Sequence, residues 1–235
     1  MIDTHSHILP GIDDGAKTIA DSVEMVRELV NQGVSDIVLT PHYMDETIYT
    51  HPKSKNKLLL NQLRQALKYE DVDVRLYLGN EIYITDKIQQ LIWNDEISAM
   101  AGGKYLLIEL PMTGEFPGYE DIFIDLMKAG YQVMLAHPER YHAMQDDYDK
   151  LTELYNIGVL FQSNIGSILG QYGKHAKKTM QKLANDRLIF SLGTDIHHCK
   201  GDGYIGAAKK KLMKYYDEQE LKQIMEDNPQ KVLKG

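Results

Sequence analysis

Short apolar runs alternate along the chain with longer segments in which apolar residues recur every three or four positions. The short runs are typical of strands covered on both faces, and the longer segments are typical of amphipathic helices. The pattern predicts seven strands, at 2–7, 36–40, 74–78, 105–109, 132–136, 159–162 and 188–192. Helices are expected between them, at about 18–31, 54–69, 86–93, 119–129, 148–156 and 174–185, and again after the last strand.

Strands that alternate with helices form parallel βαβ units, which build a barrel or a doubly wound sheet rather than a sandwich. The sequence contains no internal repeat, low-complexity segment or long linker, so we expect one α/β domain over residues 1–235. The longest connection runs from Met44 to Lys57 and is a candidate lid. In such folds the chemistry gathers at the C-terminal ends of the strands.

Two histidines lie in the first predicted strand. His5 and His7 are one residue apart, so an extended backbone puts both rings on one face, where they can bind one metal ion. Such a pair alone fits a solvated strand edge equally well. Further residues of metal-ligating type, however, stand at or just past the ends of five predicted strands: His42, Glu81, Glu109, His137, Asp195 and His197. Nitrogen and oxygen ligands without thiolate suit Zn²⁺, Mn²⁺ or Fe²⁺, and several carboxylates allow bridging, so a multinuclear hydrolase site is predicted.

The loops after two strands hold further candidates. In Asp13-Asp14-Gly15 an aspartate can be a metal ligand or a turn former, and the purely structural role is favoured more for Asp13 than for Asp14. Arg140, three residues past His137, can present paired N–H donors to two phosphate oxygens, which a lysine does not match. The alternative for Arg140 is an ordinary surface salt bridge.

Taken in order, these segments resemble the bacterial exopolysaccharide-associated tyrosine-protein phosphatases of the polymerase and histidinol phosphatase (PHP) type. The resemblance implies a distorted (β/α)₇ TIM-like barrel, the PHP fold. It also implies metal-dependent hydrolysis of phosphotyrosine on a tyrosine autokinase that controls capsule or exopolysaccharide assembly. It rests on Asp3-Thr4-His5-Ser6-His7, Asp13-Asp14-Gly15, Thr40-Pro41-His42, Gly79-Asn80-Glu81-Ile82, Ile108-Glu109, Ala136-His137-Pro138-Glu139-Arg140 and Thr194-Asp195-Ile196-His197.

The resemblance further implies three divalent metal ions, with manganese expected and zinc, cobalt or iron as alternatives. A metal-bridging hydroxide would attack phosphorus in line, with Arg140 as the catalytic and phosphate-binding residue and no phosphoenzyme. Carried over position by position, one ion belongs to His5, His7, Glu81 and Asp195. Glu81 bridges to a second ion held by Glu109 and His137, and Asp14, His42 and His197 hold the third.

One position departs from the family pattern. The family commonly has a second phosphate-binding arginine about seven residues after the aspartate that matches Asp195, and here that residue is Asp202. We expect Lys200, or backbone N–H groups of Gly201-Asp202-Gly203, to take over part of its role.

Composition narrows the remaining function classes. The formal net charge of −8 disfavours nucleic-acid binding, and the lysines at 177–178 and 209–211 are expected to be solvated. The sequence lacks a signal peptide and a long apolar stretch, which predicts a cytoplasmic protein without membrane insertion. The lone Cys199 fits a reducing compartment. It cannot serve a cysteine-phosphatase loop, because Ile205 stands where that loop needs arginine.

Three alternatives stay open at this point. A PHP phosphatase of a small metabolite such as histidinol phosphate would use the same metals with a different pocket wall. An amidohydrolase also opens with His-x-His, but it typically bridges its metals through a modified lysine, whereas Glu81 occupies the bridging position here. A non-catalytic PHP module would have lost ligands, yet all nine expected positions are filled.

Overall fold

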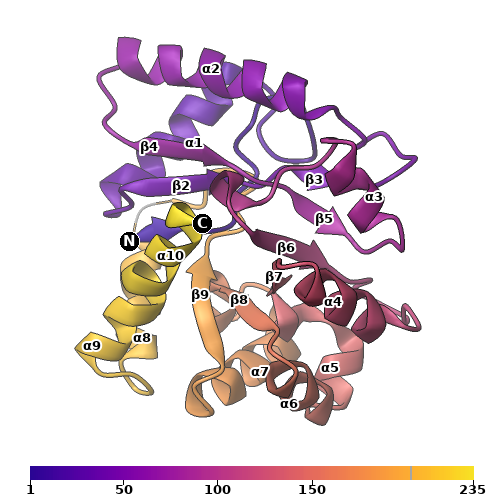
Figure 1. Cartoon of the computed structure of the whole chain (residues 1–235). Coiled ribbons are helices and arrows are strands. Elements are labelled where there is room, and N and C mark those ends of the chain that lie inside the picture. The colour runs from indigo at the N-terminus through magenta and orange to yellow at the C-terminus, as the bar shows by residue number, and fades with distance from the viewer. Residues whose placement is uncertain (202) are drawn as a thin grey trace.

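The computed structural model of the chain describes residues 1–201 and 203–235. Every strand pair in this part is parallel, with β1 (Ile2–Asp3), β2 (Asp36–Leu39) and β4 (Arg75–Leu78) in one sheet. The second sheet has the order β3 (His42–Tyr43), β5 (Glu81–Tyr83), β6 (Tyr105–Glu109), β7 (Gln132–Ala136), β8 (Leu160–Asn164) and β9 (Ile189–Gly193). Helices surround both sheets (Figure 1).

The helices follow the predicted segments closely. Thr18 caps the first of them with a capping box, its hydroxyl accepting from the Asp21 N–H, as expected for a helix that begins at this position. The helices are α1 (Ile19–Asn31), α2 (Lys53–Tyr69), α3 (Ile88–Trp93), α4 (Tyr119–Lys128), α5 (His142–Asp146), α6 (Asp149–Asn156), α7 (Gly173–Asn185), α8 (Tyr204–Leu212), α9 (Glu218–Lys222) and α10 (Asn228–Lys234). Short turns of 3₁₀ helix are η1 (Met100–Gly102), η2 (Pro138–Arg140) and η3 (Ile165–Leu169), and the π-helical turn η4 (Gln223–Asp227) precedes α10.

Two of the seven predicted strands, 36–40 and 74–78, are each followed by a second short strand that was not predicted. Pro41 separates β2 from β3, because proline has no N–H to donate to a ladder. Gly79 and Asn80 separate β4 from β5, and the Asn80 amide spans the break by donating to the Pro41 carbonyl at 3.1 Å and accepting from the Ser98 N–H at 2.8 Å. The described residues therefore contain nine strands, seven at predicted positions and two, β3 and β5, just beyond the predicted ends at 40 and 78.

The two ends of the strand order meet and close the ring. The Asp195 N–H donates to the His5 carbonyl at 2.8 Å, the His7 N–H donates to the Ile196 carbonyl at 3.0 Å, and Ser6 forms a parallel bridge with Ile196. The expected distorted (β/α)₇ barrel is confirmed, with backbone pairing in the first strand limited to Ile2–Asp3 and this bridge.

Alternate residues of the strands face two different apolar clusters. On β6, Leu106 and Ile108 join the large outer cluster under the helices, whereas Tyr105 and Leu107 join an inner cluster. The inner cluster lies inside the barrel and also contains Val232 of α10. Helix α10 contacts β1 and β9 at the N-terminal ends of the strands (Figure 1). Apolar side chains therefore fill one end of the barrel interior, and the same inward-facing rows continue into polar residues at the other end.

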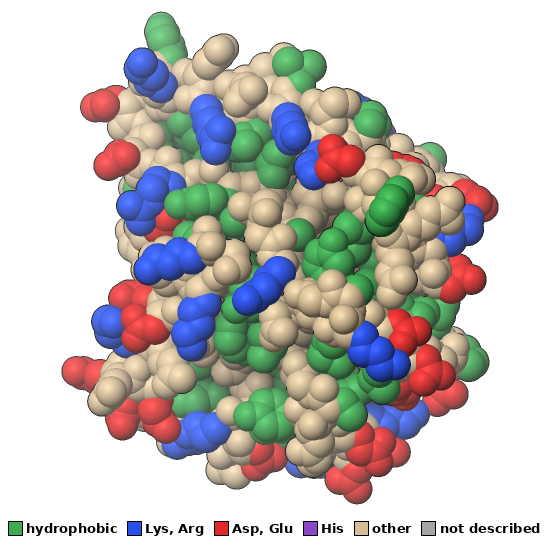
Figure 2. All heavy atoms as spheres, in the orientation of Figure 1, with side chains coloured by type: hydrophobic (Ala, Val, Ile, Leu, Met, Phe, Trp, Pro, Cys, Tyr) green, Lys and Arg blue, Asp and Glu red, His purple; other side chains and the backbone are tan. Residues whose placement is uncertain are grey.

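On the face that Figure 2 shows, Lys and Arg side chains are scattered among acidic and apolar ones. In the described part of the chain no helix is long and apolar enough to cross a membrane. The candidate lid is shorter than predicted, because α2 begins at Lys53 and leaves residues 44–52 as the loop.

Candidate metal centre

The buried centre of the site is formed by two histidines and two carboxylates. The Nε2 atoms of His5 and His7 lie 3.1 Å apart, and each is 3.1 Å from Oε2 of Glu81. Oδ1 of Asp195 lies 3.5 Å from the first of these nitrogens and 3.4 Å from the second. Ligand atoms about 2.1 Å from a common divalent ion are separated by roughly 3.0 to 3.4 Å in octahedral or tetrahedral geometry. His5, His7 and Glu81 therefore have the spacing of a metal-binding set, and Asp195 lies beside both histidines.

A second set continues from the other oxygen of Glu81. Its Oε1 lies 2.8 Å from Nε2 of His137, which is 3.8 Å from Oε1 of Glu109. His42 Nδ1 faces the same two carboxylates, at 3.1 Å from Glu81 Oε2 and 3.8 Å from Glu109 Oε2. Glu81 thus has neighbours of metal-ligating type on both of its oxygens, as a bridging carboxylate does.

The third set lies at the more exposed edge. Oδ1 of Asp14 is 3.3 Å from Nε2 of His197 and 3.5 Å from Nε2 of His42, and the His7 and His197 rings stack at 4.0 Å. The structure therefore brings all nine predicted ligands into one connected cluster. The three compact groups found among the described residues differ from the expected assignment, since His7 and His42 each fall into two of them and Asp195 and His137 fall into none.

The donor atoms of this cluster fit divalent cations. His42 Nδ1, Glu81 Oε2 and His137 Nδ1 are buried and have no hydrogen-bond partner within the described residues, which is rare for buried polar atoms. Burial alone raises the pKa of Glu81, but the charges of His5 and His42 hold that pKa well below its usual range. Burial and the neighbouring Glu81 raise the pKa of Glu109 to about 9. Closely packed carboxylates and imidazoles of this kind are stabilised together by a bound cation.

Local backbone geometry aims several of these side chains. His137 and Asp195 have φ of 32° and 50°, so each leaves the alternation of its strand at the point where the strand ends. Gly15 is required where it stands, because a Cβ there would lie 1.9 Å from the His7 carbonyl oxygen. Asp-Asp-Gly is therefore a close-packed turn under His7 as well as a source of ligands.

Three residues that the sequence did not assign to the site orient the ligands. The Nδ1–H of His7 donates to Asp13 Oδ2 at 2.8 Å, and the Nδ1–H of His5 donates to Gln162 Oε1 at 2.7 Å, so each ring turns Nε2 toward the centre. Asp13 also accepts from the Gly15 N–H, so its turn-forming role is present beside this one. Asn164 Nδ2 donates to Asp195 Oδ2 at 2.7 Å. Gln162 and Asn164 lie two residues apart on β8, but this spacing alone does not mark them as site residues.

Beside the metal set lies an open cavity of about 550 Å³. Arg140 lines it and donates from Nη1 to Asp195 Oδ2 at 2.7 Å, so Arg140 is part of the site and not of a surface salt bridge. Lys200 lines the same cavity, as do Tyr172, which the sequence did not single out, and the ligands Asp195 and His197. Asp202 lies outside the described residues.

Cys199 also lines the cavity, and its environment disfavours nucleophilic chemistry. Burial and the neighbouring Glu28 carboxylate raise the pKa of the Cys199 thiol to about 11, whereas nucleophilic cysteines need a lowered pKa. Among the remaining histidines, His142 and His175 are exposed as expected, His198 is exposed, and His51 is half-buried.

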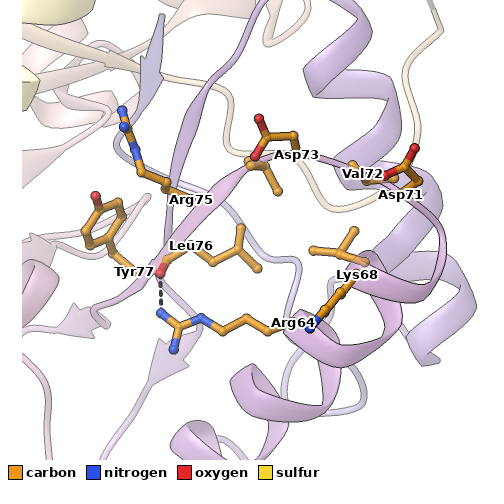
Figure 3. A pocket seen from close by; sticks show the side chains of 10 residues that line it. Arg64, Lys68, Asp71, Val72, Asp73, Arg75, Leu76 and Tyr77 are labelled. Carbon is orange, nitrogen blue, oxygen red and sulfur yellow. Dashed lines mark hydrogen bonds between the residues drawn. The ribbon is translucent and has the colours of Figure 1, made fainter.

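A different hollow, of about 760 Å³, lies between α2 and β4 away from these ligands (Figure 3). Arg64 reaches across it and donates to the Leu76 carbonyl at 2.6 Å. Arg75 is directed to Asp36, with its Nη2 2.7 Å from Oδ2. The groups of metal-ligating residues found in the described chain all lie elsewhere, so this hollow carries no comparable chemistry.

Comparison with known proteins decides the family. The model of the family described as "Capsular polysaccharide synthesis, CpsB/CapC" matches residues 1–234. The chain belongs to the CpsB/CapC family. This CpsB/CapC chain is 36% identical over 224 residues to the putative tyrosine-protein phosphatase CapC of Staphylococcus aureus, covering 94% of this chain and 87% of that protein. It is 35% identical over 201 residues to the tyrosine-protein phosphatase YwqE of Bacillus subtilis, covering 85% and 78%.

Solved structures agree with this membership. A chain from the crystal structures of YwqE from Bacillus subtilis and CpsB from Streptococcus pneumoniae, described as unique metal-dependent tyrosine phosphatases, superposes with a TM-score of 0.89. The identity is 32%, and the match covers 100% of this CpsB/CapC chain and 94% of that one. An amidohydrolase from Mycoplasma synoviae, at 12% identity and a TM-score of 0.58 over 99% of this chain and 87% of that one, shares the fold alone.

Proposed function

We propose that this chain is a metal-dependent protein-tyrosine phosphatase, a phosphoric monoester hydrolase that acts on a phosphotyrosine-bearing protein of capsule or exopolysaccharide synthesis. One observation supports this more than any other. Asp195 directs Oδ1 toward the His5 and His7 nitrogens and Oδ2 toward Arg140, on the wall of an open cavity. A cation site and an anion-binding side chain thus share one carboxylate, which suits hydrolysis of a phosphate ester. The relatives named as tyrosine-protein phosphatases support the same substrate class.

The ligand assignment is part of the proposal. We assign His5, His7, Glu81 and Asp195 to one divalent ion, Glu81, Glu109 and His137 to a second, and Asp14, His42 and His197 to a third, with manganese as the expected metal. The short distances between the side chains within each set support this assignment. When bound, such ions lower the pKa of a coordinated water and neutralise charge on the phosphoryl oxygens. Gln162 and Asp13 keep the His5 and His7 rings oriented as Nε2 ligands.

Arg140 and Lys200 supply the organic cations. Within the described residues the guanidinium has one hydrogen-bond acceptor, Asp195, so further N–H donors of Arg140 are free for phosphoryl oxygens. Lys200 takes over part of the role of the family's second arginine, since its ammonium lies on the wall of the same cavity. Both groups bind and orient the ester, and the half-buried setting strengthens their interaction with its charge.

The partner follows from the family and the charge. We propose a tyrosine autokinase of polysaccharide assembly as the substrate protein, and the single cysteine fits the reducing cytoplasm in which we place this activity. The activity is assigned to one domain over residues 1–235. With 26 basic against 34 acidic residues, the protein captures an anionic substrate through the local site and not through its overall charge.

The test is a metal add-back assay. Metal-stripped protein is assayed on a phosphotyrosine peptide and on histidinol phosphate with Mn²⁺, Zn²⁺, Co²⁺ or Mg²⁺ restored one at a time, with His5→Ala as the control. We expect phosphotyrosine hydrolysis that returns with metal and is lost in His5→Ala. Activity confined to histidinol phosphate would replace the proposal with the metabolite alternative. Hydrolysis of neither ester with any metal would point to a non-catalytic module.

A further inference from the structure

Tyr172 stands between the two cations of the cavity. The Arg140 guanidinium lies over its ring, with Cζ 4.5 Å from the ring centroid, and the Lys200 ammonium lies over the same ring at 5.6 Å. The phenol oxygen is 3.4 Å from Lys200 Nζ and 3.4 Å from Asp195 Oδ2. Every one of these contacts is made to a group of the site, so Tyr172 does more than precede the first turn of α7.

Lys200 is fixed at both ends. Its backbone N–H lies 3.0 Å from each carboxylate oxygen of Glu28, a largely buried residue of α1. Its ammonium donates to the Thr194 carbonyl at 3.3 Å and lies 5.8 Å from the Tyr204 ring centroid. A lysine enclosed between two aromatic rings has lost much of the freedom of a surface lysine, so it is prepared to meet a ligand.

The Arg140 guanidinium and the Lys200 ammonium repel each other, so a third group is needed to keep both of them at the cavity. A ring face attracts both a guanidinium and an ammonium, and its edge hydroxyl accepts from the ammonium. Tyr172 supplies both interactions at once, whereas any aliphatic side chain in its place supplies neither. The arrangement suits a ligand with several anionic oxygens, such as a phosphate monoester, better than it suits a single carboxylate.

We propose that Tyr172 is a positioning residue that holds Arg140 and Lys200 as the two arms of a phosphate clamp. This inference rests on the proposed function for its physiological substrate, but the clamp itself concerns the binding of phosphate. The two tyrosine contacts are separable, because phenylalanine keeps the ring under Arg140 and loses only the hydroxyl, while leucine loses both.

The experiment uses full-length, metal-loaded protein and compares Tyr172→Phe and Tyr172→Leu with the wild type. Calorimetry measures the affinity for inorganic phosphate, and steady-state kinetics on p-nitrophenyl phosphate separates KM from kcat. We expect Tyr172→Leu to weaken phosphate binding and raise KM by about tenfold, with kcat within about threefold and metal content unchanged. For Tyr172→Phe we expect a KM rise of about two- to threefold.

Tyr148→Leu is the matched control, because Lys182 lies over the Tyr148 ring at 3.8 Å, and neither residue lines the cavity. It should leave phosphate affinity and KM unchanged. Unaltered phosphate affinity in Tyr172→Leu would overturn the proposal. A lower kcat and a lower content of bound metal at unchanged KM would also overturn it. If Tyr172→Leu fails to fold, Tyr172→Phe decides, and an unchanged KM there counts against the clamp. If Tyr172→Leu weakens phosphate binding but the wild-type protein hydrolyses no phosphotyrosine, the clamp is supported and phosphotyrosine is rejected as the substrate.

Discussion

Replacing Asn164 with alanine should weaken metal binding far more than it slows the metal-saturated protein. The substitution removes two buried contacts, the donation from Nδ2 to Asp195 Oδ2 at 2.7 Å and the acceptance from Gln162 Nε2 at 3.2 Å. The Asn164 N–H donates to Glu139 Oε1 through the backbone and is retained in alanine. One lost contact is to the ligand Asp195 and the other is to Gln162, which orients the ligand His5, whereas the local fold keeps its own hydrogen bond.

The magnitude follows from the charge of Asp195. A hydrogen bond to a charged group contributes about 1.5 to 3 kcal/mol, and loss of a residue that orients a metal ligand typically costs about 10- to 100-fold in affinity. Because Asn164 does not line the cavity, we expect KM for a phosphate ester to change by less than about threefold once metal is saturating.

Titration of Mn²⁺ into metal-stripped protein, followed by calorimetry and by recovery of activity, measures both quantities. Ser163→Ala is the matched control on the same strand, because Ser163 is fully buried and its hydroxyl has no partner in the described structure. It should bind Mn²⁺ as the wild type does. The reasoning is refuted if Asn164→Ala binds Mn²⁺ within twofold of the wild type, or if Ser163→Ala weakens binding equally.

Three further predictions concern other parts of the structure. Arg140→Lys should raise KM for a phosphotyrosine peptide by about tenfold, because lysine lacks paired donors; equal KM values would contradict this. Tyr141→Phe should lower the free energy of unfolding, measured in urea, by about 1 to 3 kcal/mol. The reason is that the Tyr141 hydroxyl accepts from the buried Leu110 N–H at 3.0 Å and donates to the Ala136 carbonyl at 2.8 Å. Tyr216→Phe, whose hydroxyl has no described partner, should leave the free energy of unfolding nearly unchanged. Burial raises the pKa of Asp36, but its hydrogen bonds to Arg75 outweigh this effect, so the pKa lies below its usual value. The ion pair therefore stabilises the protein at neutral pH, and its contribution fades as pH falls below about 4. Unfolding midpoints of wild type and Asp36→Asn should therefore converge from pH 7 to pH 3, and a constant gap would exclude this ion pair as the cause.

The strand ends and their ligands were predictable because both depend on local pattern. A histidine or glutamate at the end of an apolar run shows where the strand ends. In a parallel barrel the C-terminal ends of all strands lie at the same edge, whichever strands are paired. The short strands β3 and β5 were not predicted, since each apolar run ends before Pro41 or Gly79 and only two or three residues pair beyond it. The left-handed backbone at His137 and Asp195 was also missed. It arises where a strand turns into the site, and nothing in the local sequence requires it.

The orienting residues were missed for a different reason. Gln162, Asn164 and Tyr172 act through side chains that approach the ligands only after the barrel closes, so no spacing along the chain identifies them. Gln162 lies 157 positions from His5 in sequence yet 2.7 Å from its ring. Amides and tyrosines at strand ends and helix starts are common, and their roles become visible only from their partners.

Asp195 makes the metal set and the phosphate clamp parts of one system. One of its oxygens faces His5 and His7, and the other accepts from Arg140 and Asn164 and lies 3.4 Å from the Tyr172 hydroxyl. If a cation is held at the first oxygen, the second oxygen would hold Arg140 less strongly, and the Arg140 guanidinium would then be available to a phosphoryl group. Binding free energies are linked reciprocally, so phosphate must in turn change the affinity for metal by the same factor. The shared carboxylate therefore favours a site in which metal and phosphate ester bind together over one in which either binds alone.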